Sequence, residues 1–169
     1  MRRIGSVLAK EEFDGAINLF TSFGFYDDKT NADILRQCCS LVQPKGFFAL
    51  EIMNRDWIVR NFQPRGFSRY ENLIVLEDRV FDPKTSRIGT TWTYLVQKDD
   101  ENFALEKQVT IDNRLWSLHE LIDIFEKTGW KFKKAYPGFG RQQGDIALME
   151  AHRLFFIAMK PPLTKKCVA

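Results

Sequence analysis

The first third of the chain alternates short apolar runs with an amphipathic stretch, a pattern typical of strands joined by a helix. Gly15–Phe20 is a short, mainly apolar run after an acidic cluster, as expected of a strand buried on both faces. A helix is predicted to begin near Thr30 or Asn31, either of which can cap it, and to end at Pro44-Lys45-Gly46. Phe47–Met53 is a second apolar run. Because a strand, a helix and a strand with short links form a crossover unit, these two strands are predicted to be parallel.

The middle of the chain predicts antiparallel strands instead of another crossover. Two turn-rich segments, Asp82–Ser86 and Lys98–Asn102, separate apolar stretches at the spacing of hairpins. Apolar positions in the third of these stretches alternate only in part, so its register stays open. The three predicted strands are Leu73–Phe81, Thr90–Gln97 and Phe103–Ile111.

Helix and strand patterns return near the carboxyl end. Ser117 and Glu120 have the spacing of a capping box, in which the serine accepts from a helix amide and the glutamate reaches back. The helix that follows is predicted to end at Gly129. Strands are predicted at Lys131–Tyr136 and Arg153–Met159, so the chain as a whole is assigned to the α/β class.

Composition excludes several classes of protein. The 169 residues are 44% hydrophobic, enough for a sizeable core, and 25 basic against 22 acidic residues give a net charge of +3, too weak to indicate a nucleic-acid partner. Three cysteines and two histidines, without Cys-x-x-Cys or His-Glu-x-x-His spacing, argue against a disulfide framework or a metal site. No apolar run approaches the roughly 20 residues that span a membrane and no secretory signal is visible, so a cytoplasmic protein is expected.

The order of these elements resembles part of a known enzyme family. Phe13–Phe25 is similar to the fourth strand and following loop of class I S-adenosylmethionine-dependent methyltransferases, in the small-molecule branch whose loop reads Ser-Phe-Gly-aromatic. Leu41–Gly46 resembles the turn into that fold's fifth strand, and Arg114–Leu121 and Lys127–Trp130 resemble the start and end of its late helix. Asp82–Arg87 matches an antiparallel insertion of this branch, and the resemblance extends over residues 1–161.

The chain also departs from the family pattern. The fold has seven strands, and its first three carry a glycine-rich cofactor turn and an acidic residue that do not occur here. The pair Gly138-x-Gly140 lies too late and without the required context. The resemblance therefore implies a Rossmann-like methyltransferase sheet truncated to strands four to seven, with an antiparallel β insertion. The missing amino-terminal part would belong to a longer gene or to the other half of a split enzyme.

The resemblance implies a binding site for S-adenosylmethionine at the carboxyl ends of the first strands, where ligands bind in open α/β sheets. Met1 and Arg2 resemble the stretch that follows the family's adenine-binding acid. The backbone around Leu19 and Phe20 would accept from the amino group of the cofactor, and Ser22 would lie beside the methyl group. No catalytic acid or base is assigned, because methyl transfer from a sulfonium depends mainly on placement and dry walls.

Six residues are predicted to form the substrate pocket, each with an alternative reading. Aromatic residues of the loop would wall the methyl group, or simply pack in the interior. Polar residues after the second strand would orient a carboxylate, or act as a helix cap and a surface cation. A late arginine would face the same mouth or form a surface pair, and a tyrosine would cover the substrate or belong to the core. These residues are Phe23, Tyr26, Asn54, Arg55, Arg114 and Tyr136.

These inferences predict the organisation of the chain and its function. Residues 1–65 would hold strands four and five, residues 66–112 the insertion, residues 113–161 the late helix with strands six and seven, and residues 162–169 a tail. The predicted function is methyl transfer from S-adenosylmethionine to a small-molecule acceptor, with this chain as the carboxyl-terminal part of the enzyme. The alternative is a non-catalytic module with a methyltransferase-like half-fold, which pairs with the missing half or with a second copy to form a dimer.

Overall fold

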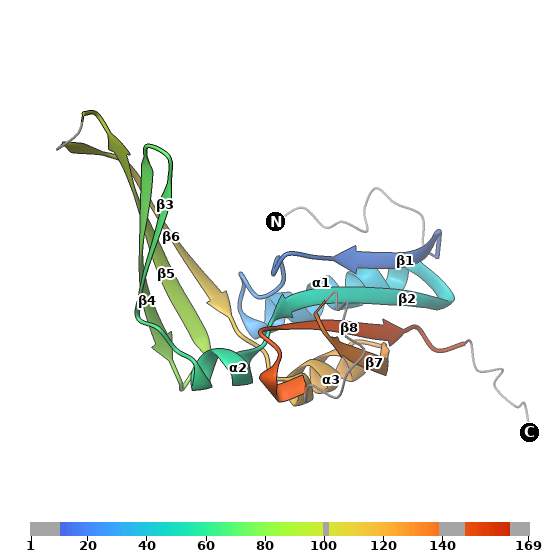
Figure 1. The fold of residues 1–169 in the computed structure, drawn as a ribbon. Coiled ribbons are helices and arrows are strands. Elements are labelled where there is room, and N and C mark those ends of the chain that lie inside the picture. Colours follow the sequence, from blue (N-terminus) through green and yellow to red (C-terminus); the bar gives the residue numbers. More distant parts are fainter. Residues whose placement is uncertain (1–10, 100–101, 139–147, 163–169) are drawn as a thin grey trace, which may run out of the picture.

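The computed structural model describes residues 11–99, 102–138 and 148–162, which form two separate four-stranded sheets (Figure 1). Met1 and Arg2 of the predicted cofactor site lie outside the described residues. The elements are, in chain order, β1 (Phe13–Asn18), α1 (Asp28–Leu41), β2 (Val42–Met53), α2 (Arg55–Arg60), β3 (Arg65–Tyr70), β4 (Leu73–Asp82), β5 (Arg87–Gln97), β6 (Phe103–Arg114), α3 (Leu118–Lys127), β7 (Lys131–Pro137), the 3₁₀ turn η2 (Leu148–Glu150) and β8 (Arg153–Met159).

The first sheet has the strand order β1-β2-β8-β7. β1 and β2 are parallel and joined by α1, which confirms the predicted crossover, whereas β8 is antiparallel to both β2 and β7. β1, β2 and β7 therefore end at the same edge of the sheet, where β8 begins. β1 and β2 occupy the places predicted for strands four and five, and β7 and β8 those predicted for strands six and seven. This mixed sheet confirms the predicted fold class.

α1 and α3 cover one face of the first sheet (Figure 1). Alternate residues of β2 and β8 point toward these helices and are buried, as the two-residue period of a strand requires. The indole of Trp130 donates a hydrogen bond to the carbonyl oxygen of Leu35 at 3.1 Å and so ties the end of α3 to α1. The strand residues of this core are Phe48, Leu50, Ile52, Leu154, Phe156 and Ala158, and the helix residues include Leu35, Leu121 and Phe125.

The opposite face of the first sheet is covered by no helix among the described residues. Ile17 of β1 lies beside Ala49 of β2 on this face and is 66% exposed. The ring of Phe47 lies over Gly15, where a Cβ atom would meet the ring at 2.6 Å. We call this surface, formed by Ile17, Phe47, Phe155, Ile157 and Met159, the helix-free face.

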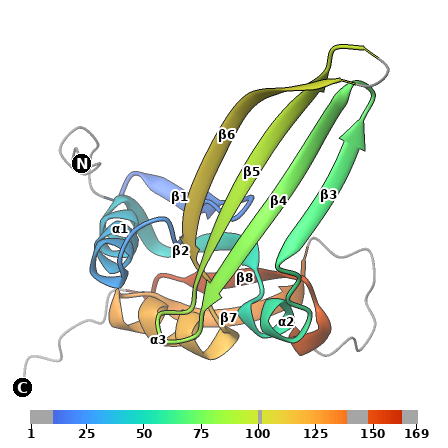
Figure 2. The ribbon, with the colours of Figure 1, turned by 90° about the vertical axis from the view of Figure 1, so that its left-hand side faces the viewer.

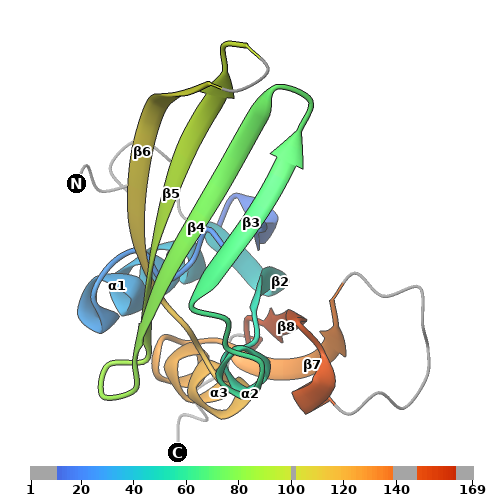
Figure 3. The same cartoon turned by 60° about the vertical axis from the view of Figure 1, so that its left-hand side comes forward.

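The second sheet is antiparallel, with the strand order β3-β4-β5-β6, and projects away from the helices (Figures 2 and 3). The three predicted strands are confirmed, but β3 was not predicted because its sequence, Arg-Gly-Phe-Ser-Arg-Tyr, has few apolar positions. The partial alternation in β6 has a structural cause. Tyr94 pairs with Lys107 and Leu95 with Leu105, so a β-bulge leaves Glu106 outside the pairing.

Several element ends differ from the prediction. β1 ends at Asn18 and not at Phe20, and β5 begins at Arg87 and not at Thr90. Asp27, not Thr30 or Asn31, caps α1, because its carboxylate accepts from the Thr30 amide at 2.7 Å and the chain turns earlier. β2 begins at Val42 directly after α1, so Pro44–Gly46 is part of the strand instead of the helix stop. The strand accommodates these residues through an irregularity in its pairing with β1 and a positive φ of 71° at Lys45. The capping box of α3 is confirmed.

Candidate functional site

The carboxyl edge of the first sheet gathers loops from distant parts of the chain. The start of α2 meets the segment between β6 and α3 through the bridge between Asn54 and Trp116. The segment after β1 meets the end of β6, because the Arg114 N–H donates to the carbonyl oxygen of Gly24 at 2.8 Å. The start of β8 lies at the same edge, because the backbone N–H of Asn54 donates to the carbonyl oxygen of His152 at 2.9 Å. In open α/β sheets this edge is where ligands bind.

The segment Leu19–Ser22, which we call the β1 loop, has an unusual backbone. Phe20 and Thr21 have φ values of 56° and 58°, in the left-handed region that residues other than glycine rarely adopt. The Ser22 N–H donates to the carbonyl oxygen of Leu19 at 3.3 Å, and the Phe20 side chain is 79% exposed. Left-handed non-glycine residues persist only where surrounding contacts fix them, and they concentrate at functional sites.

Glu51 is the residue that fixes the β1 loop. Its side chain is 1% exposed, and its two carboxylate oxygens accept hydrogen bonds from the Phe20 N–H at 2.8 Å and from the Arg153 guanidinium at 2.6 Å. The carbonyl oxygen of Glu51 accepts from the Thr21 N–H at 3.1 Å. Arg153 also donates to the Thr21 hydroxyl at 3.2 Å, so a partly buried ion pair holds both left-handed residues.

Beside this loop, the last residue of β1 carries an unused acceptor. The side-chain oxygen of Asn18 is buried and has no hydrogen-bond partner among the described residues. A buried polar atom without a partner is costly in a folded protein and commonly marks a place that a ligand or an ion fills.

The structure places Phe23 in the core instead of at an opening. Its side chain is 2% exposed and packs against Trp116 and Phe125, with ring centroids 5.5 and 6.5 Å away. Tyr26 lies farther along the segment, is half exposed, and accepts hydrogen bonds at its carbonyl oxygen from Asn31 and Arg87. Of these two predicted pocket residues, only Tyr26 has a side chain open to solvent.

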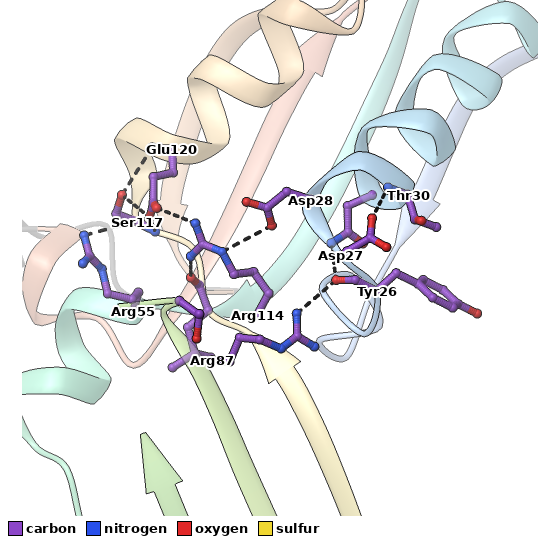
Figure 4. A network of polar contacts seen from close by, with 12 residues as sticks. Tyr26, Asp27, Asp28, Thr30, Arg55, Arg87, Arg114, Ser117 and Glu120 are labelled. Carbon is purple, nitrogen blue, oxygen red and sulfur yellow. Dashed lines mark hydrogen bonds and ion pairs between the residues drawn. The ribbon is translucent and has the colours of Figure 1, made fainter. Parts of the chain in front are cut away.

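Arg114 is fully engaged by neighbouring groups (Figure 4). Its guanidinium pairs with Glu120 at 2.6 Å and with Asp28 at 3.4 Å, donates to the carbonyl oxygen of Leu115, and lies 4.4 Å over the ring of Trp116. It thereby joins the first turns of α1 and α3. Because its buried guanidinium already has all these partners, Arg114 stabilises the fold and is not free to bind a substrate.

Asn54 and Arg55 are also occupied by structural contacts. Asn54 is buried, caps α2 by accepting from the Asp56 N–H, and donates to the carbonyl oxygens of Leu148 and Ala151 at 2.8 and 2.9 Å. The helix-cap alternative therefore describes Asn54. The Arg55 side chain is partly exposed and lies 2.9 Å from the Asp56 carboxylate.

Tyr136 lies near the end of β7, on the side of the first sheet that carries the helix-free face. Its ring contacts Phe155 with centroids 6.5 Å apart, and Lys134 lies 4.7 Å over it. None of these contacts brings it to the other predicted pocket residues.

A cavity of about 480 Å³ opens between α2 and the second sheet. We call it the α2 cavity. Trp57 and Phe62 come from α2 and the residues after it, and Trp92 comes from β5, so aromatic rings line it from both sides. Its volume falls in the range of small-molecule sites. Its polar lining residues are Asn61, Gln63, Glu77, Arg79, Thr90, Asn113 and His152.

None of the six residues predicted for the substrate pocket lines the α2 cavity, and His152 is one of the lining residues that the sequence reasoning missed. Its ring meets the ring of Trp57 edge-on, with centroids 4.5 Å apart. Burial lowers the pKa of His152 below its usual value, and the nearby Arg153 lowers it further, against a smaller opposite effect of Glu51. The available signal was its position directly before an antiparallel strand, which places it at the ligand-binding edge.

The β1 loop and the α2 cavity are joined through Thr21. Asn113, which lines the cavity, donates from its side-chain amide to the Thr21 carbonyl oxygen at 3.3 Å. Arg153, which follows His152 in the chain, donates to the Thr21 hydroxyl. A ligand on the loop and a ligand in the cavity would therefore be neighbours.

Two further observations concern metal ligands and membrane-spanning helices in the described residues. No group of three or more His, Cys, Asp or Glu side chains in the described part of the chain is arranged to bind a metal ion. None of the helices within the described ranges is long and apolar enough to cross a membrane.

Comparison with known proteins identifies the fold. No protein-family model matches the chain, and no curated protein matches it in sequence. The structure is similar to an S-adenosylmethionine-dependent methyltransferase from Clostridium acetobutylicum, with a TM-score of 0.73 and 9% identity over 95% of this chain and 63% of that chain. It is also similar to the CcbJ methyltransferase from Streptomyces caelestis, with a TM-score of 0.74 and 16% identity over 91% of this chain and 59% of that chain.

A third solved structure, a sugar N-methyltransferase from Streptoalloteichus, has a TM-score of 0.61 and 13% identity over 88% of this chain and 56% of that chain. The chain thus has the fold of class I S-adenosylmethionine-dependent methyltransferases, and it spans less than two thirds of the length of each of these structures. The resemblance inferred from the sequence is confirmed at the level of the fold.

Proposed function

We propose that this chain contributes to methyl transfer from S-adenosylmethionine to a small molecule. The observation that carries the proposal is the contact of Thr21 with Asn113 and Arg153, which joins a strained loop at the carboxyl edge to an aromatic cavity. The similarity to methyltransferases supports the choice of reaction, and the cavity volume supports a small-molecule acceptor.

The described residues fit one side of the methyl donor. The β1 loop offers the backbone oxygen of Phe20, and Asn18 offers its partnerless side-chain oxygen, to the amino group of the donor. The Leu19 oxygen, which was predicted for the same role, already accepts from the N–H and the hydroxyl of Ser22. When bound, S-adenosylmethionine supplies a methyl group on a sulfonium, which an acceptor attacks in line. In this proposal Met1 and Arg2 keep their predicted places beside the adenine.

The residues of the chain act mainly by positioning. Glu51 and Arg153 hold the β1 loop, so the donor would meet a surface that is already ordered. Trp57, Phe62 and Trp92 provide an apolar wall that keeps water from the reacting atoms. The chain's own contribution is then to orient the methyl donor and the acceptor toward each other where the β1 loop meets the α2 cavity.

The proposal includes a further polypeptide segment that completes the donor site, upstream in a longer chain or in a separate chain. β1 is an edge strand among the described residues, with free backbone groups on its outer side, and the side chain of its Ile17 is exposed. An exposed edge strand is a template for pairing with another strand. The length spanned in the solved methyltransferases is consistent with such a segment.

A second candidate, a non-catalytic dimerisation or partner module, is favoured by a different observation. The projecting second sheet exposes large apolar side chains on both of its faces, including Tyr70 on the cavity side and Phe67 and Leu105 on the other. Apolar patches of this kind usually mark interaction surfaces.

Calorimetry with S-adenosylhomocysteine tests the first candidate against the second. The chain is titrated alone and together with the polypeptide encoded directly upstream, and binding is expected to be tight only in the mixture. Asn18→Ala should weaken that binding about threefold to tenfold, since a hydrogen bond to the ligand is lost. Asn72→Ala, in the β3–β4 hairpin, is the matched control and should bind as the unchanged chain does. Absence of binding in both titrations would favour the partner module.

A further inference from the structure

We propose that His152 accepts the proton of the methyl acceptor, and that the α2 cavity takes a ring-shaped acceptor whose nucleophile carries an N–H or O–H group. The methyl-transfer step of this inference rests on the proposed function. The binding preference does not, because it follows from the cavity alone.

The position of His152 suits this role. Its imidazole lines the cavity, and Trp57 holds it by an edge-on ring contact. Among the described residues no hydrogen bond is made to the imidazole, so its nitrogen atoms are available to a ligand. The backbone of the same residue is anchored, since its carbonyl oxygen accepts from the Asn54 N–H.

The charged groups around His152 favour its neutral form. Arg153 adjoins it in the chain, and Glu51 lies beyond Arg153 and is paired with it. Glu77 and Arg79 face the cavity from β4 and are paired with each other, so they add little net charge. Burial and Arg153 lower the pKa of His152 from its usual 6.5, which leaves the imidazole neutral and able to accept a proton near pH 7.

The shape and polarity of the α2 cavity define the class of acceptor. Trp57 and Trp92 offer faces and edges on which a ring can pack, and Phe62 extends this apolar wall. Glu77 and Arg79 form a polar patch where Arg79 passes over Gly66, with its nitrogen atoms about 3.1 Å from where a Cβ atom would lie. A ring compound with a polar substituent at one end and a nucleophile toward His152 matches this lining.

The proton transfer completes the bond changes of methylation. The acceptor's N–H or O–H bond breaks, and its proton passes to a nitrogen of His152. The freed lone pair of the acceptor atom forms the bond to the methyl carbon as the carbon–sulfur bond breaks. The electron pair of that bond stays on sulfur, so the sulfonium becomes a neutral thioether and the positive charge moves to the imidazolium.

Matched pairs of probes test the binding preference on the full chain. The first pair is phenol and anisole, and the second is aniline and N,N-dimethylaniline, in which methyl groups replace the hydrogen atoms of the O–H or N–H group. Binding is followed by the NMR signals of the imidazole of His152 and the indoles of Trp57 and Trp92. The probes with the exchangeable proton are expected to bind about threefold to tenfold more tightly, the value of one hydrogen bond.

Two variants and a pH series decide the outcome. In the His152→Phe variant the difference in affinity between the two probes of each pair should vanish. In the His119→Phe variant, which changes the other histidine of the chain, the difference should persist. In the unchanged chain the preference should also vanish as pH falls and the His152 signal titrates, which needs no variant to fold. Equal affinities within each pair, or a preference that His152→Phe retains, would overturn the inference. Because calorimetry with S-adenosylhomocysteine is separate, failure of donor binding would reject methyl transfer while leaving the cavity result intact.

Discussion

At the scale of single residues, the carboxyl edge of the first sheet separates polar groups that serve the fold from those that remain available. Arg114 and Asn54 donate hydrogen bonds to neighbouring carboxylate and carbonyl oxygens. Asn18 and His152 have polar atoms without a partner among the described residues, one beside the β1 loop and one in the α2 cavity. Because folding leaves few polar atoms unpaired, the second group is where ligand binding is expected.

The most consequential single residue for the β1 loop is Glu51. Glu51→Ala should cost about 1–3 kcal/mol of unfolding free energy, because it removes two hydrogen bonds to a carboxylate and leaves Arg153 without its partner. The estimate lies below that for a fully buried ion pair, since the Arg153 side chain is partly exposed. Urea unfolding measures this loss.

Hydrogen exchange separates the loop effect from a general loss of stability. The amides of Phe20 and Thr21 should exchange faster in Glu51→Gln, while those of β4 and β5 stay protected. Glu77→Gln is the matched control, since Glu77 also pairs with an arginine but lies in the second sheet. If the Phe20 amide exchanged equally faster in both variants, Glu51 would not stabilise the β1 loop specifically.

At the scale of elements, local signals were sufficient wherever a few neighbouring residues decide the structure. The capping box at Ser117 and Glu120 predicted the start of α3, and an apolar run predicted the bounds of β8. For β1 the apolar run predicted the strand but placed it two residues too late. β3 was not predicted, and the start of α2 was predicted only by the helix-cap alternative for Asn54. Each has six residues, too few to show a period, so pairing with β4 stabilises β3 and capping by Asn54 stabilises α2.

The candidate site was predictable in its location but not in its side chains. The segment after β1 lies at the carboxyl edge of the sheet, as the crossover rule predicts, although the strand ends at Asn18 and not at the predicted Phe20. Whether Phe23 faced a pocket or the core depended on Trp116 and Phe125, which are distant in sequence. His152 and Trp92 meet in one cavity only because two sheets lie side by side, which no local pattern encodes.

The start of α3 supplies a prediction about pH. Burial raises the pKa of Glu120, but hydrogen bonds from Arg114 and Ser117 outweigh it, so the pKa lies below the usual 4.5 (Figure 4). A carboxylate with a lowered pKa in the folded state contributes stability above its unfolded pKa and loses it as pH falls through the folded pKa. Urea midpoints should therefore fall below about pH 5 in the unchanged chain.

The Glu120→Gln variant should be less stable than the unchanged chain at pH 7. Its urea midpoint should fall less steeply as the pH decreases. Glu126→Gln, at the other end of α3, is the control, and its midpoints should fall as steeply as those of the unchanged chain. Parallel curves for Glu120→Gln and the unchanged chain would contradict the role assigned to the Arg114 pair.

At the scale of the whole molecule, helices within the described ranges cover only one side of the first sheet. α1 and α3 bury the residues of one face, whereas the helix-free face leaves Ile17 and Phe47 exposed among the described residues. The free edge of β1 borders this face. An apolar surface next to an unpaired strand edge is a strong combination for association.

The chain by itself is therefore expected to associate through the β1 edge and the helix-free face. Sedimentation velocity over a concentration series should show a reversible oligomer, and Ile17→Lys should weaken it about tenfold or more. The reason is that a lysine on an edge strand both removes an apolar contact and opposes strand pairing. Val59→Lys, a similar change on the exposed side of α2, is the control and should leave association unchanged. If Val59→Lys weakens the oligomer and Ile17→Lys does not, the interaction surface lies elsewhere, and the projecting second sheet becomes the favoured location. If adding the upstream polypeptide dissociates the oligomer, the same face binds both a second copy and the upstream polypeptide. A completed methyltransferase sheet requires this outcome.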